Sequence, residues 1–422
     1  MRLRLLTDRD VSLSDLLFVR PISLATYIRR GGYLGLAQAV KTGPESVLES
    51  VRQSGLRGRG GAGFPTWKKW ERVIQQKNCT KYLCVNAAED EPGTFKDRYL
   101  LRANPHQIIE GAIVSAFAIG AKQIYLYING RYDEEIQFME QALLESKQHR
   151  YWGEGSASEV DIKVTRSPGT YVAGEETALI EVIEGRVAKP RQKPPYYPAN
   201  SGLFGMPTAV NNAETIANIP HIVRNGADQF RSIGSPRSPG TMVFTLTGEV
   251  RRPGLYELPL GTTVRELIDQ YGGGAIGRMK AVFPGGPSNA ILSGDKIDVA
   301  LDFDEMKEVS SGLGTGAVIV FSEKNCMVRV AILYSRFFSR ESCGQCPPCI
   351  LGTKHLSEIL EQIESGQGTD KEIRMVEQVC GMIKGRGYCY LLTGAAIATE
   401  SIFQNFRPEF EAHIHGAGCP IV

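Results

Sequence analysis

The chain has 422 residues, of which 42% are hydrophobic and 22% charged, and its formal net charge is +2. This length suffices for about two or three domains with sizeable cores, whereas the near-neutral charge predicts no nucleic-acid partner. The longest smoothly apolar run, residues 111–121, is too short for a bilayer, which needs about 20 apolar residues. Nine cysteines and no secretion signal at residues 1–10 predict a cytoplasmic protein without direct membrane insertion.

The first region, residues 1–235, alternates short apolar runs with stretches of helical periodicity. Strands are predicted at residues 81–86, 123–128 and 159–164, and helices at residues 105–120, 132–146 and 174–185. Alternation of strands and helices is typical of an α/β layer with a parallel or mixed sheet. Residues 226–241, rich in Gly, Ser and Pro, then predict a linker.

The second region, residues 241–323, is short and strand-rich. Strands are predicted at residues 242–250, 255–258, 279–283 and 317–321, with one short helix at residues 262–272. A hairpin, a helix and further strands predict a small α+β domain of the β-grasp kind. Because it contains no cluster of titratable residues, we expect it to serve in packing.

The third region, residues 325–422, is helical. Apolar residues recur at i, i+3 and i+4 in residues 326–340, 355–365, 371–383 and 392–406. This pattern predicts a small C-terminal helical bundle.

Cys343, Cys346 and Cys349 follow a C-x2-C-x2-C spacing, which directs three thiolates at one centre. Iron–sulfur clusters use this triple spacing, whereas the alternative, a structural zinc ion, more often uses two separated C-x2-C pairs. A fourth ligand could be Cys380 or Cys389. Cys380 falls on the apolar face of a helix, where a cysteine is usually a small core residue, so we predict Cys389 as the fourth metal ligand.

Residues 54–70 contain five glycines, flanked by arginines and lysines. Such a stretch predicts an anion lying against the backbone, because glycine lets peptide N–H groups approach a ligand closely. A dinucleotide-binding Rossmann loop should follow a strand. Residues 44–54 instead have helical spacing, so a standard Rossmann loop is not predicted here.

Six motifs occur in the order found in the NADH-binding flavoprotein subunit of respiratory complex I, which the chain therefore resembles. They are GLRGRGGAGFPTWKKW, VNAAEDEPGTFKDR, YVAGEETALIEVIEG, RQKPP, NNAET and ESCGQCPPC. Related chains serve as diaphorase subunits of NAD-linked hydrogenases and formate dehydrogenases. The resemblance implies an oxidoreductase with an α/β flavin-binding domain, a β-grasp domain and a C-terminal helical bundle carrying an iron–sulfur cluster.

The resemblance also implies the cofactors FMN and a [4Fe–4S] cluster, with NADH as the substrate. A hydride would pass from NADH to FMN, and single electrons would then pass to the cluster, with no side chain acting as catalytic acid, base or nucleophile. Lys69 is expected near the flavin phosphate. The expected flavin contacts are Gly58, Arg59, Gly60, Lys69, Asn86, Glu89, Tyr171, Gly174, Glu175, Asn211, Asn212 and Thr215.

On the NADH side, the resemblance implies the stretch from Gly61 to Phe64, with Phe64 as a stacking platform for an aromatic ring. Glu91 and Glu176 are expected near the nicotinamide and its ribose, where carboxylates accept hydroxyl hydrogen bonds. Lys193 is expected to meet the dinucleotide.

Departures from the family pattern leave a second function open. Trp67 stands where the family has glycine, and a tryptophan would be strained there if φ were positive. Ala88 replaces an acid, and Arg72 could suit the 2′-phosphate of NADPH. The alternative is thus an electron-relay or docking subunit with lost or altered nicotinamide specificity.

The resemblance implies a place in the peripheral arm of a membrane-associated redox complex. The expected partners are a small, thioredoxin-like iron–sulfur subunit and a larger multi-cluster subunit. The six histidines show no ligand spacing, and His413 and His415 lie near the C-terminus, so we expect structural or solvent-exposed histidines.

Overall fold

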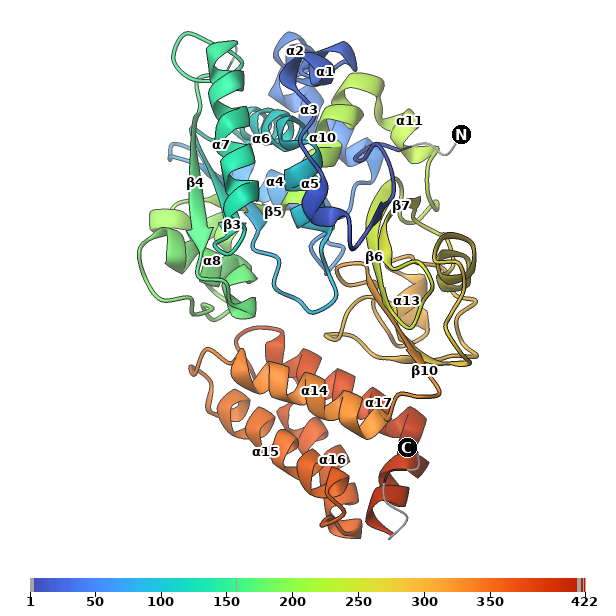
Figure 1. Ribbon diagram of the computed structural model, residues 1–422. Coiled ribbons are helices and arrows are strands. Elements are labelled where there is room, and N and C mark those ends of the chain that lie inside the picture. The colour runs from blue at the N-terminus through green and yellow to red at the C-terminus, as the bar shows by residue number, and fades with distance from the viewer. Residues whose placement is uncertain (1–3, 157, 416–418, 420, 422) are drawn as a thin grey trace.

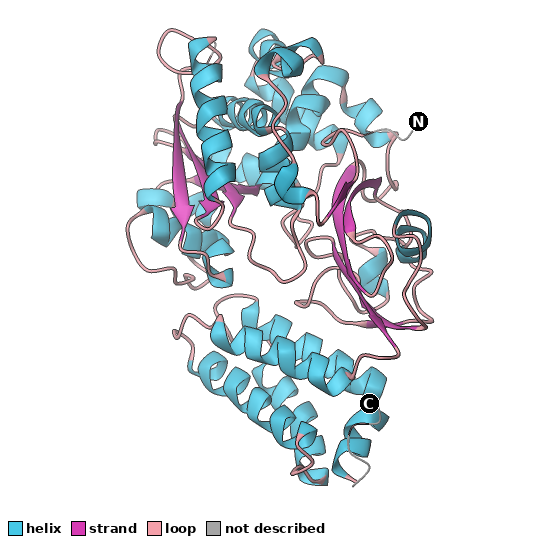
Figure 2. Cartoon of the chain, viewed as in Figure 1, coloured by secondary structure: helices cyan, strands magenta, loops and turns pink. Residues whose placement is uncertain are grey.

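The computed structural model describes residues 4–156, 158–415, 419 and 421. Figure 1 shows an N-terminal α/β layer, a second sheet beside it, and a helical bundle that lies below both in this view. Figure 2 shows the strands gathered in two separate sheets, with most helices around the first sheet and in the bundle. This order along the chain agrees with the predicted α/β, strand-rich and helical regions.

The first sheet is parallel throughout, with the strand order β4-β3-β2-β5. Its strands are β2 (Tyr82–Ala87), β3 (Gln123–Asn129), β4 (Asp161–Ser167) and β5 (Thr208–Asn212). β2 and β3 are nearly continuous apolar runs, as expected for parallel strands covered on both faces. Their carboxyl ends therefore meet along one edge of the sheet.

Helices cover this sheet. Almost every residue of α6 (Pro105–Ile119) is buried and most are apolar, so this helix lies in the middle of the layer. α10 (Ala213–Asn225) packs closely on α6 at Gly111, where a Cβ would come within 2.1 Å of the Ile216 carbonyl oxygen. The other helices of the layer are α1 (Leu24–Arg29), α2 (Leu34–Thr42), α3 (Pro44–Ser54), α4 (Thr66–Gln75), α5 (Lys96–Ala103), α7 (Asp133–Gln148), α8 (Glu176–Ile183), α9 (Pro198–Ser201) and α11 (Ala227–Arg231).

The second sheet has the strand order β1-β7-β6-β10-β8-β9. Its strands are β1 (Val11–Ser12), β6 (Thr241–Gly248), β7 (Gly254–Pro259), β8 (Met279–Phe283), β9 (Leu292–Ser293) and β10 (Ala317–Ser322). β6 and β10 pair in parallel, and the other neighbours pair antiparallel. The edge strand β1 comes from the N-terminal region, so residues 11 and 12 cross onto this sheet.

The helix predicted at residues 262–272 begins as expected but does not stay regular. Thr263 and Glu266 form a capping box that starts α12 (Val264–Glu266). The chain then continues as a π-helical turn, Leu267–Tyr271. The predicted linker is also folded, since it contains α11 and the buried Ser238.

The bundle consists of α14 (Met327–Arg340), α15 (Pro347–Glu364), α16 (Asp370–Ile383) and α17 (Leu391–Ile414). α15 begins earlier than predicted, because Pro347 and Pro348 fit the first helical turn. α17 runs past Pro408 and bends at Phe406, whose φ of −129° is not helical. His413 is consequently a buried residue at the end of a helix.

The N-terminal segment is held to the α/β layer by the fully buried guanidinium of Arg102. Its Nη1 lies 2.6 Å from Glu135 Oε1, and its Nε donates to the Val19 carbonyl oxygen at 3.3 Å. Glu134 Oε2 adds a contact of 2.7 Å to Nη2. A buried cation of this kind depends on its carboxylate partners.

We expect Glu135→Ala to destabilise the protein by on the order of 3 kcal/mol, because the buried Arg102 loses its main partner. Glu364→Ala, which removes the pair with the exposed Arg329, should cost at most about 1 kcal/mol. Differential scanning calorimetry of both variants measures the shift of the first unfolding transition. Equal shifts would contradict this role of Glu135.

Candidate cofactor site

Several of the predicted flavin contacts lie where the strands of the first sheet end. Asn86 lies near the end of β2 and Asn212 at the end of β5. Asn212 Nδ2 donates to the Asn86 carbonyl oxygen at 3.2 Å, so the two strand ends are joined directly. In α/β proteins, ligands bind outside the carboxyl ends of parallel strands.

The glycine-rich loop between α3 and α4 lies over these strand ends. It is closed at its base by a bridge between Arg57 and Pro65 and by the bond from Gly58 N to the Phe64 carbonyl oxygen, 2.9 Å. A Cβ on Gly60 would come within 3.0 Å of Asn212 Cβ, so the loop backbone lies close to the end of β5 at this residue. Gly61 has φ +132°, and a Cβ on it would meet nothing within 4 Å. The loop thus presents bare backbone to open space.

Two predicted flavin contacts, Arg59 and Thr215, are buried behind the loop. The Arg59 N–H donates to Thr215 Oγ1 at 2.8 Å, which fixes the loop to the start of α10. The Arg59 guanidinium points toward the second sheet, where it donates to the Pro239 carbonyl oxygen. Burial lowers the pKa of Arg59 to about 10.

Lys69, Glu176 and Lys193 form one ion-pair group beside the loop. Lys69 Nζ lies 3.0 Å from Glu176 Oε2, and Lys193 Nζ lies 3.1 Å from Glu176 Oε1. Burial alone would raise the pKa of Glu176, but the two ammonium groups lower it to about 2. Glu175 caps α8 through the N–H groups of Thr177 and Ala178 and also binds Lys193.

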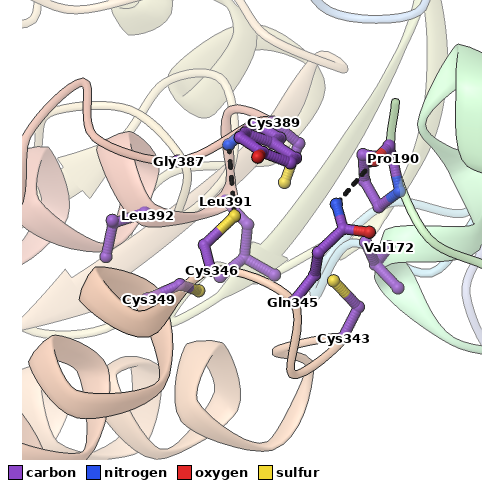
Figure 3. A pocket seen from close by; sticks show the side chains of 11 residues that line it. Val172, Pro190, Cys343, Gln345, Cys346, Cys349, Gly387, Cys389, Leu391 and Leu392 are labelled. Atoms are coloured by element: carbon purple, nitrogen blue, oxygen red, sulfur yellow. Dashed lines mark hydrogen bonds between the residues drawn. The ribbon is translucent and has the colours of Figure 1, made fainter. Parts of the chain in front are cut away.

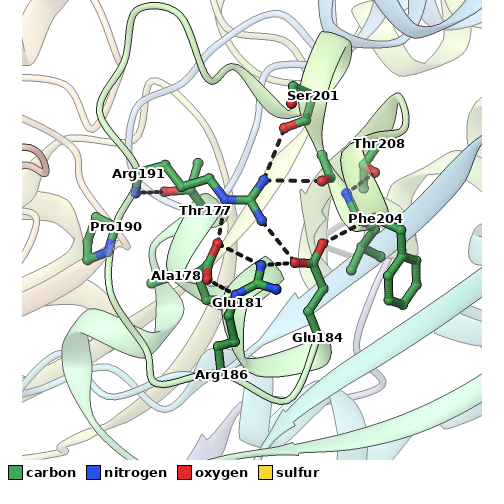
Figure 4. A network of polar contacts seen from close by, with 12 residues as sticks. Thr177, Ala178, Glu181, Glu184, Arg186, Pro190, Arg191, Ser201, Phe204 and Thr208 are labelled. Atoms are coloured by element: carbon green, nitrogen blue, oxygen red, sulfur yellow. Dashed lines mark hydrogen bonds and ion pairs between the residues drawn. The ribbon is translucent and has the colours of Figure 1, made fainter.

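The loop that carries Lys193 is fastened to α8 by Arg191 (Figure 4). The Arg191 guanidinium pairs with Glu181 and Glu184 and donates to the carbonyl oxygens of Ser201 and Gly202. A side chain held on both sides in this way restricts where Lys193 can lie.

The polar groups at the strand ends are largely used to hold the site together. Asn86 Nδ2 donates to the Gly174 carbonyl oxygen at 2.8 Å, and Asn211 Oδ1 accepts from Trp70 Nε1 at 3.0 Å. Glu89 accepts from the N–H groups of Asp97 and Arg98 at the start of α5. Burial and the neighbouring Asp97 raise the pKa of Glu89.

Glu91 and Tyr171 reach away from the strands toward the other two parts of the molecule. Glu91 accepts from Ser288 N at 3.3 Å and from Thr315 Oγ1 at 2.8 Å, both in loops of the second sheet. The Tyr171 hydroxyl lies 2.8 Å from Ser288 Oγ. The backbone N–H of Tyr171 donates to the Glu341 carboxylate at the end of α14. Both residues therefore join the α/β layer to its neighbours.

A buried ammonium group that the sequence did not reveal organises the strand ends. Lys96 Nζ lies 2.7 Å from Asp97 Oδ1, 3.0 Å from Glu214 Oε2 and 3.1 Å from Asn212 Oδ1. The Lys96 side chain is 1% exposed. The motif GTFKDR contains Lys96 and Asp97, but a sequence pattern alone cannot distinguish a buried lysine from an exposed one.

The residues at the mouth of the site include the departures from the family pattern. Phe64 is 40% exposed, with the Arg72 guanidinium 5.9 Å from its ring centroid. Trp67 lies in α4 and has no positive φ, so the backbone strain considered for it is absent, and its ring stacks with Arg52 at 4.7 Å. Ala88 is buried next to Gly174.

All four predicted cysteines line one pocket at the top of the bundle (Figure 3). Cys343 and Cys346 precede α15, Cys349 lies in its first turn, and Cys389 lies in the loop before α17. Val172 and Pro190 of the α/β layer close the other side, and Gln345 Nε2 donates to the Pro190 carbonyl oxygen at 2.7 Å. Cys380 is fully buried in α16 and does not line this pocket.

The spacing of the thiols bears on which metal group they could hold. Among the described residues, no three of these four sulfurs lie within 4.8 Å of one another. A tetrahedral zinc ion, with Zn–S bonds of about 2.3 Å, would hold its thiolates less than about 4 Å apart. A wider arrangement of thiols suits an iron–sulfur cluster, in which thiolates bind separate iron atoms.

Family models match all three parts of the chain in order. Residues 51–221 match the Nuo51 FMN-binding domain, residues 243–289 the SLBB domain, and residues 329–413 the NADH-ubiquinone oxidoreductase-F iron-sulfur binding region. The fold and the two sites therefore define a flavoprotein oxidoreductase with an iron–sulfur region.

Similar proteins narrow the family. The chain is 45% identical to the second F-type subunit of NADH-quinone oxidoreductase in Rhizobium meliloti, over 94% of this chain and 96% of the relative. It is 40% identical to the NADP-reducing hydrogenase subunit HndC of Solidesulfovibrio fructosivorans, over 96% and 83%. A crystal structure of NAD+-reducing [NiFe]-hydrogenase in the H2-reduced state superposes with a TM-score of 0.85 at 33% identity, over 94% of this chain and 67% of that chain. The chain thus belongs to the family of F-type subunits of NADH-quinone oxidoreductase.

The ion-pair group at Glu176 predicts a pH-dependent stability. Because the folded pKa of Glu176 lies below that of a free glutamate, its stabilisation is present above about pH 4.3 and is lost as the pH falls toward 2. We expect Glu176→Gln to be less stable than the wild type by on the order of 2 kcal/mol at pH 7, and the difference to shrink across this window.

Urea unfolding at a series of pH values from neutral to acid measures this difference. Glu154→Gln, which removes an exposed carboxylate in the loop between α7 and β4, is the control for loss of charge. A difference for Glu176→Gln that does not change with pH would contradict the assignment.

Proposed function

We propose that this chain is the NADH-oxidising flavoprotein subunit of a redox complex. It binds FMN at the strand ends of the first sheet and a [4Fe–4S] cluster in the cysteine pocket. When bound, FMN accepts a hydride from NADH and the cluster accepts electrons one at a time. The observation that carries the proposal is the short turn Tyr171–Gly174, because it reaches both sites.

This turn brings the two proposed sites together. Gly174 lies at the strand ends, where its carbonyl oxygen accepts from Asn86. Val172, two residues earlier, lines the cysteine pocket. A donor and an acceptor of single electrons must lie close together. Here the same short turn lines both proposed cofactor sites.

The residues at the strand ends fit a flavin phosphate and ring. The N–H groups of Gly60 and Ala62 meet no acceptor among the described residues, and both residues are exposed. The neighbouring ammonium of Lys69 is partly exposed and adds positive charge, as a phosphate site requires. We assign the flavin contacts to the backbone from Gly58 to Gly61, to Lys69, and to the strand ends that carry Asn86, Asn211 and Asn212.

Glu89, Glu175, Arg59 and Thr215 support this site from behind. Each of them uses its charge or hydrogen-bonding group on the protein itself, at a helix start or at the base of the loop. We therefore propose that they position the backbone and the asparagines that touch the flavin.

NADH enters, we propose, along the exposed face of Phe64. The ring offers a stacking surface, and Lys193 and Glu176 lie at the inner end of this path with a partly exposed ion pair. Glu91 is held by Ser288 and Thr315, so it shapes the wall of the path from the side of the second sheet. The Trp67 ring is engaged with the Arg52 guanidinium.

The wider setting follows from the relatives, which are named as subunits of NADH-quinone oxidoreductase and of a hydrogenase. We propose that this chain works in the peripheral arm of such a complex, beside a thioredoxin-like iron–sulfur subunit and a multi-cluster subunit. No helix of the described residues is long and apolar enough to cross a membrane. We further propose a β-grasp fold for residues 241–323, between domains at 1–235 and 325–422.

The central test is reduction of the bound flavin by nicotinamides. We expect NADH to bleach the flavin absorbance of the purified protein, and NADPH to do so at least about tenfold more slowly. Stopped-flow absorbance under anaerobic conditions measures both rates. Lys193→Ala should weaken the apparent NADH affinity by roughly 10-fold or more, as expected for loss of a charge-assisted contact.

Lys189→Ala, an exposed lysine on the same loop, is the matched control and should leave the NADH affinity unchanged. Flavin that neither nucleotide reduces would instead indicate an electron-relay subunit. Faster reduction by NADPH would indicate a site for the 2′-phosphate, for which Arg72 is the candidate.

The choice of cluster ligands has a separate test. Cys389→Ser should lose the cluster absorbance and the EPR signal of the reduced protein, because the pocket loses one of its four thiols. Cys380→Ser changes a thiol buried in α16 outside the pocket and should keep both signals. The reverse result would show that the ligand assignment is wrong.

A further inference from the structure

A second group of metal-binding side chains lies at the opposite end of the bundle from the cysteine pocket. Cys326 precedes α14, His413 lies in the last turn of α17, and Cys419 lies in the C-terminal segment. Their ligand atoms all lie within 4.8 Å of one another. Among the described residues, no other three His, Cys, Asp or Glu side chains bring their ligand atoms this close together.

The histidine is oriented as a metal ligand would be. His413 Nδ1 lies 2.6 Å from the Glu409 carbonyl oxygen, and since a carbonyl oxygen only accepts, Nδ1 carries the proton. Nε2 therefore presents its lone pair to the Cys326 sulfur, 3.6 Å away. Metal-binding histidines are usually held by such a bond from the other ring nitrogen.

The separation of these atoms fits one ion. Ligands of a tetrahedral zinc ion, at about 2.0–2.3 Å from the metal, lie roughly 3.5–3.8 Å from one another. Cys326 and Cys419 are both free thiols, and His413 is 2% exposed, with its Nε2 directed at the Cys326 sulfur. Two thiolates and one imidazole are a donor set typical of zinc.

The nearby carboxylate is already engaged and does not complete the group. Glu409 pairs with Lys280 at 2.5 Å and accepts from Met327 N at 3.0 Å. Lys280 in turn donates to the Asn325 carbonyl oxygen. These contacts fix the junction between β8, β10 and the bundle directly beside Cys326.

We propose that Cys326, His413 and Cys419 bind one zinc ion, with water in the fourth position. The ion ties the start of α14 to the end of α17 and holds Cys419 against both helices. The site is distinct from the cysteine pocket, and Cys326 and Cys419 lie outside residues 329–413, which match the iron-sulfur binding region.

The test is metal analysis of the full-length protein, purified anaerobically with its flavin and cluster. Inductively coupled plasma mass spectrometry should find about one zinc per chain after gel filtration in EDTA. Cys419→Ser should lower the zinc content at least about fivefold without lowering iron or flavin, because Cys419 lies in the terminal segment and away from the cofactor sites.

Matched variants test whether the zinc is bound at this site. His415→Ala and Cys79→Ser, which change residues outside the group, should keep the zinc. The zinc K-edge EXAFS of the wild type should show two sulfur ligands and lighter N/O ligands. Zinc that persists in Cys419→Ser but is lost in Cys389→Ser would place the ion in the cysteine pocket and overturn the proposal.

Two further outcomes would also overturn it. One is a wild-type protein with full iron but no zinc. The other is a loss of about two mass units in the intact protein, which would indicate a Cys326–Cys419 disulfide in place of a metal site.

Discussion

The structure depends most on how it compensates one buried positive charge, the ammonium group of Lys96. A lysine that is 1% exposed is stable only if carboxylates replace the water around it, and Asp97 and Glu214 do so at 2.7 and 3.0 Å. Glu214 also accepts from Val243 N at the start of the second sheet. One buried ion cluster thereby joins α5, α10 and both sheets at the point where the cofactor site opens.

Single hydrogen bonds connect this ion cluster to the rest of the cofactor site. Asn212 bonds to β2, and Thr215 accepts from the Arg59 N–H of the glycine-rich loop. On the other side of the site, Ser288 contacts both Glu91 and Tyr171, and Tyr171 in turn is bound to Glu341 of the bundle. The strand ends, the second sheet and the cysteine pocket are thus parts of one connected polar framework, whose bonds run from one part of the molecule to another.

Much of the fold was predictable because its elements have clear periodicity. β8 occurs at the predicted residues 279–283, and α3 lies where helical spacing argued against a Rossmann loop. Differences arose where tertiary contacts override local signals. α17 continues through Pro408 because its apolar residues, such as Phe410, are buried in the bundle core. Leu6 and Thr7 join the second sheet through the Glu257 carboxylate, a contact with no local sequence signal.

The sequence by itself determined the order of the three regions, the glycine-rich loop and the cysteine triplet, because these signals are local in the chain. Only the tertiary structure decided which polar residues face the cofactors and which hold the framework. In the sequence nothing distinguishes Arg59, Glu89 and Glu91 from residues that contact a cofactor. In the structure their charged groups are bonded to the protein itself. Likewise, Cys326 and His413 are 87 residues apart, and only the packing of α14 against α17 brings them together. Burial and partnership depend on the whole fold, and no spacing rule within one segment contains them.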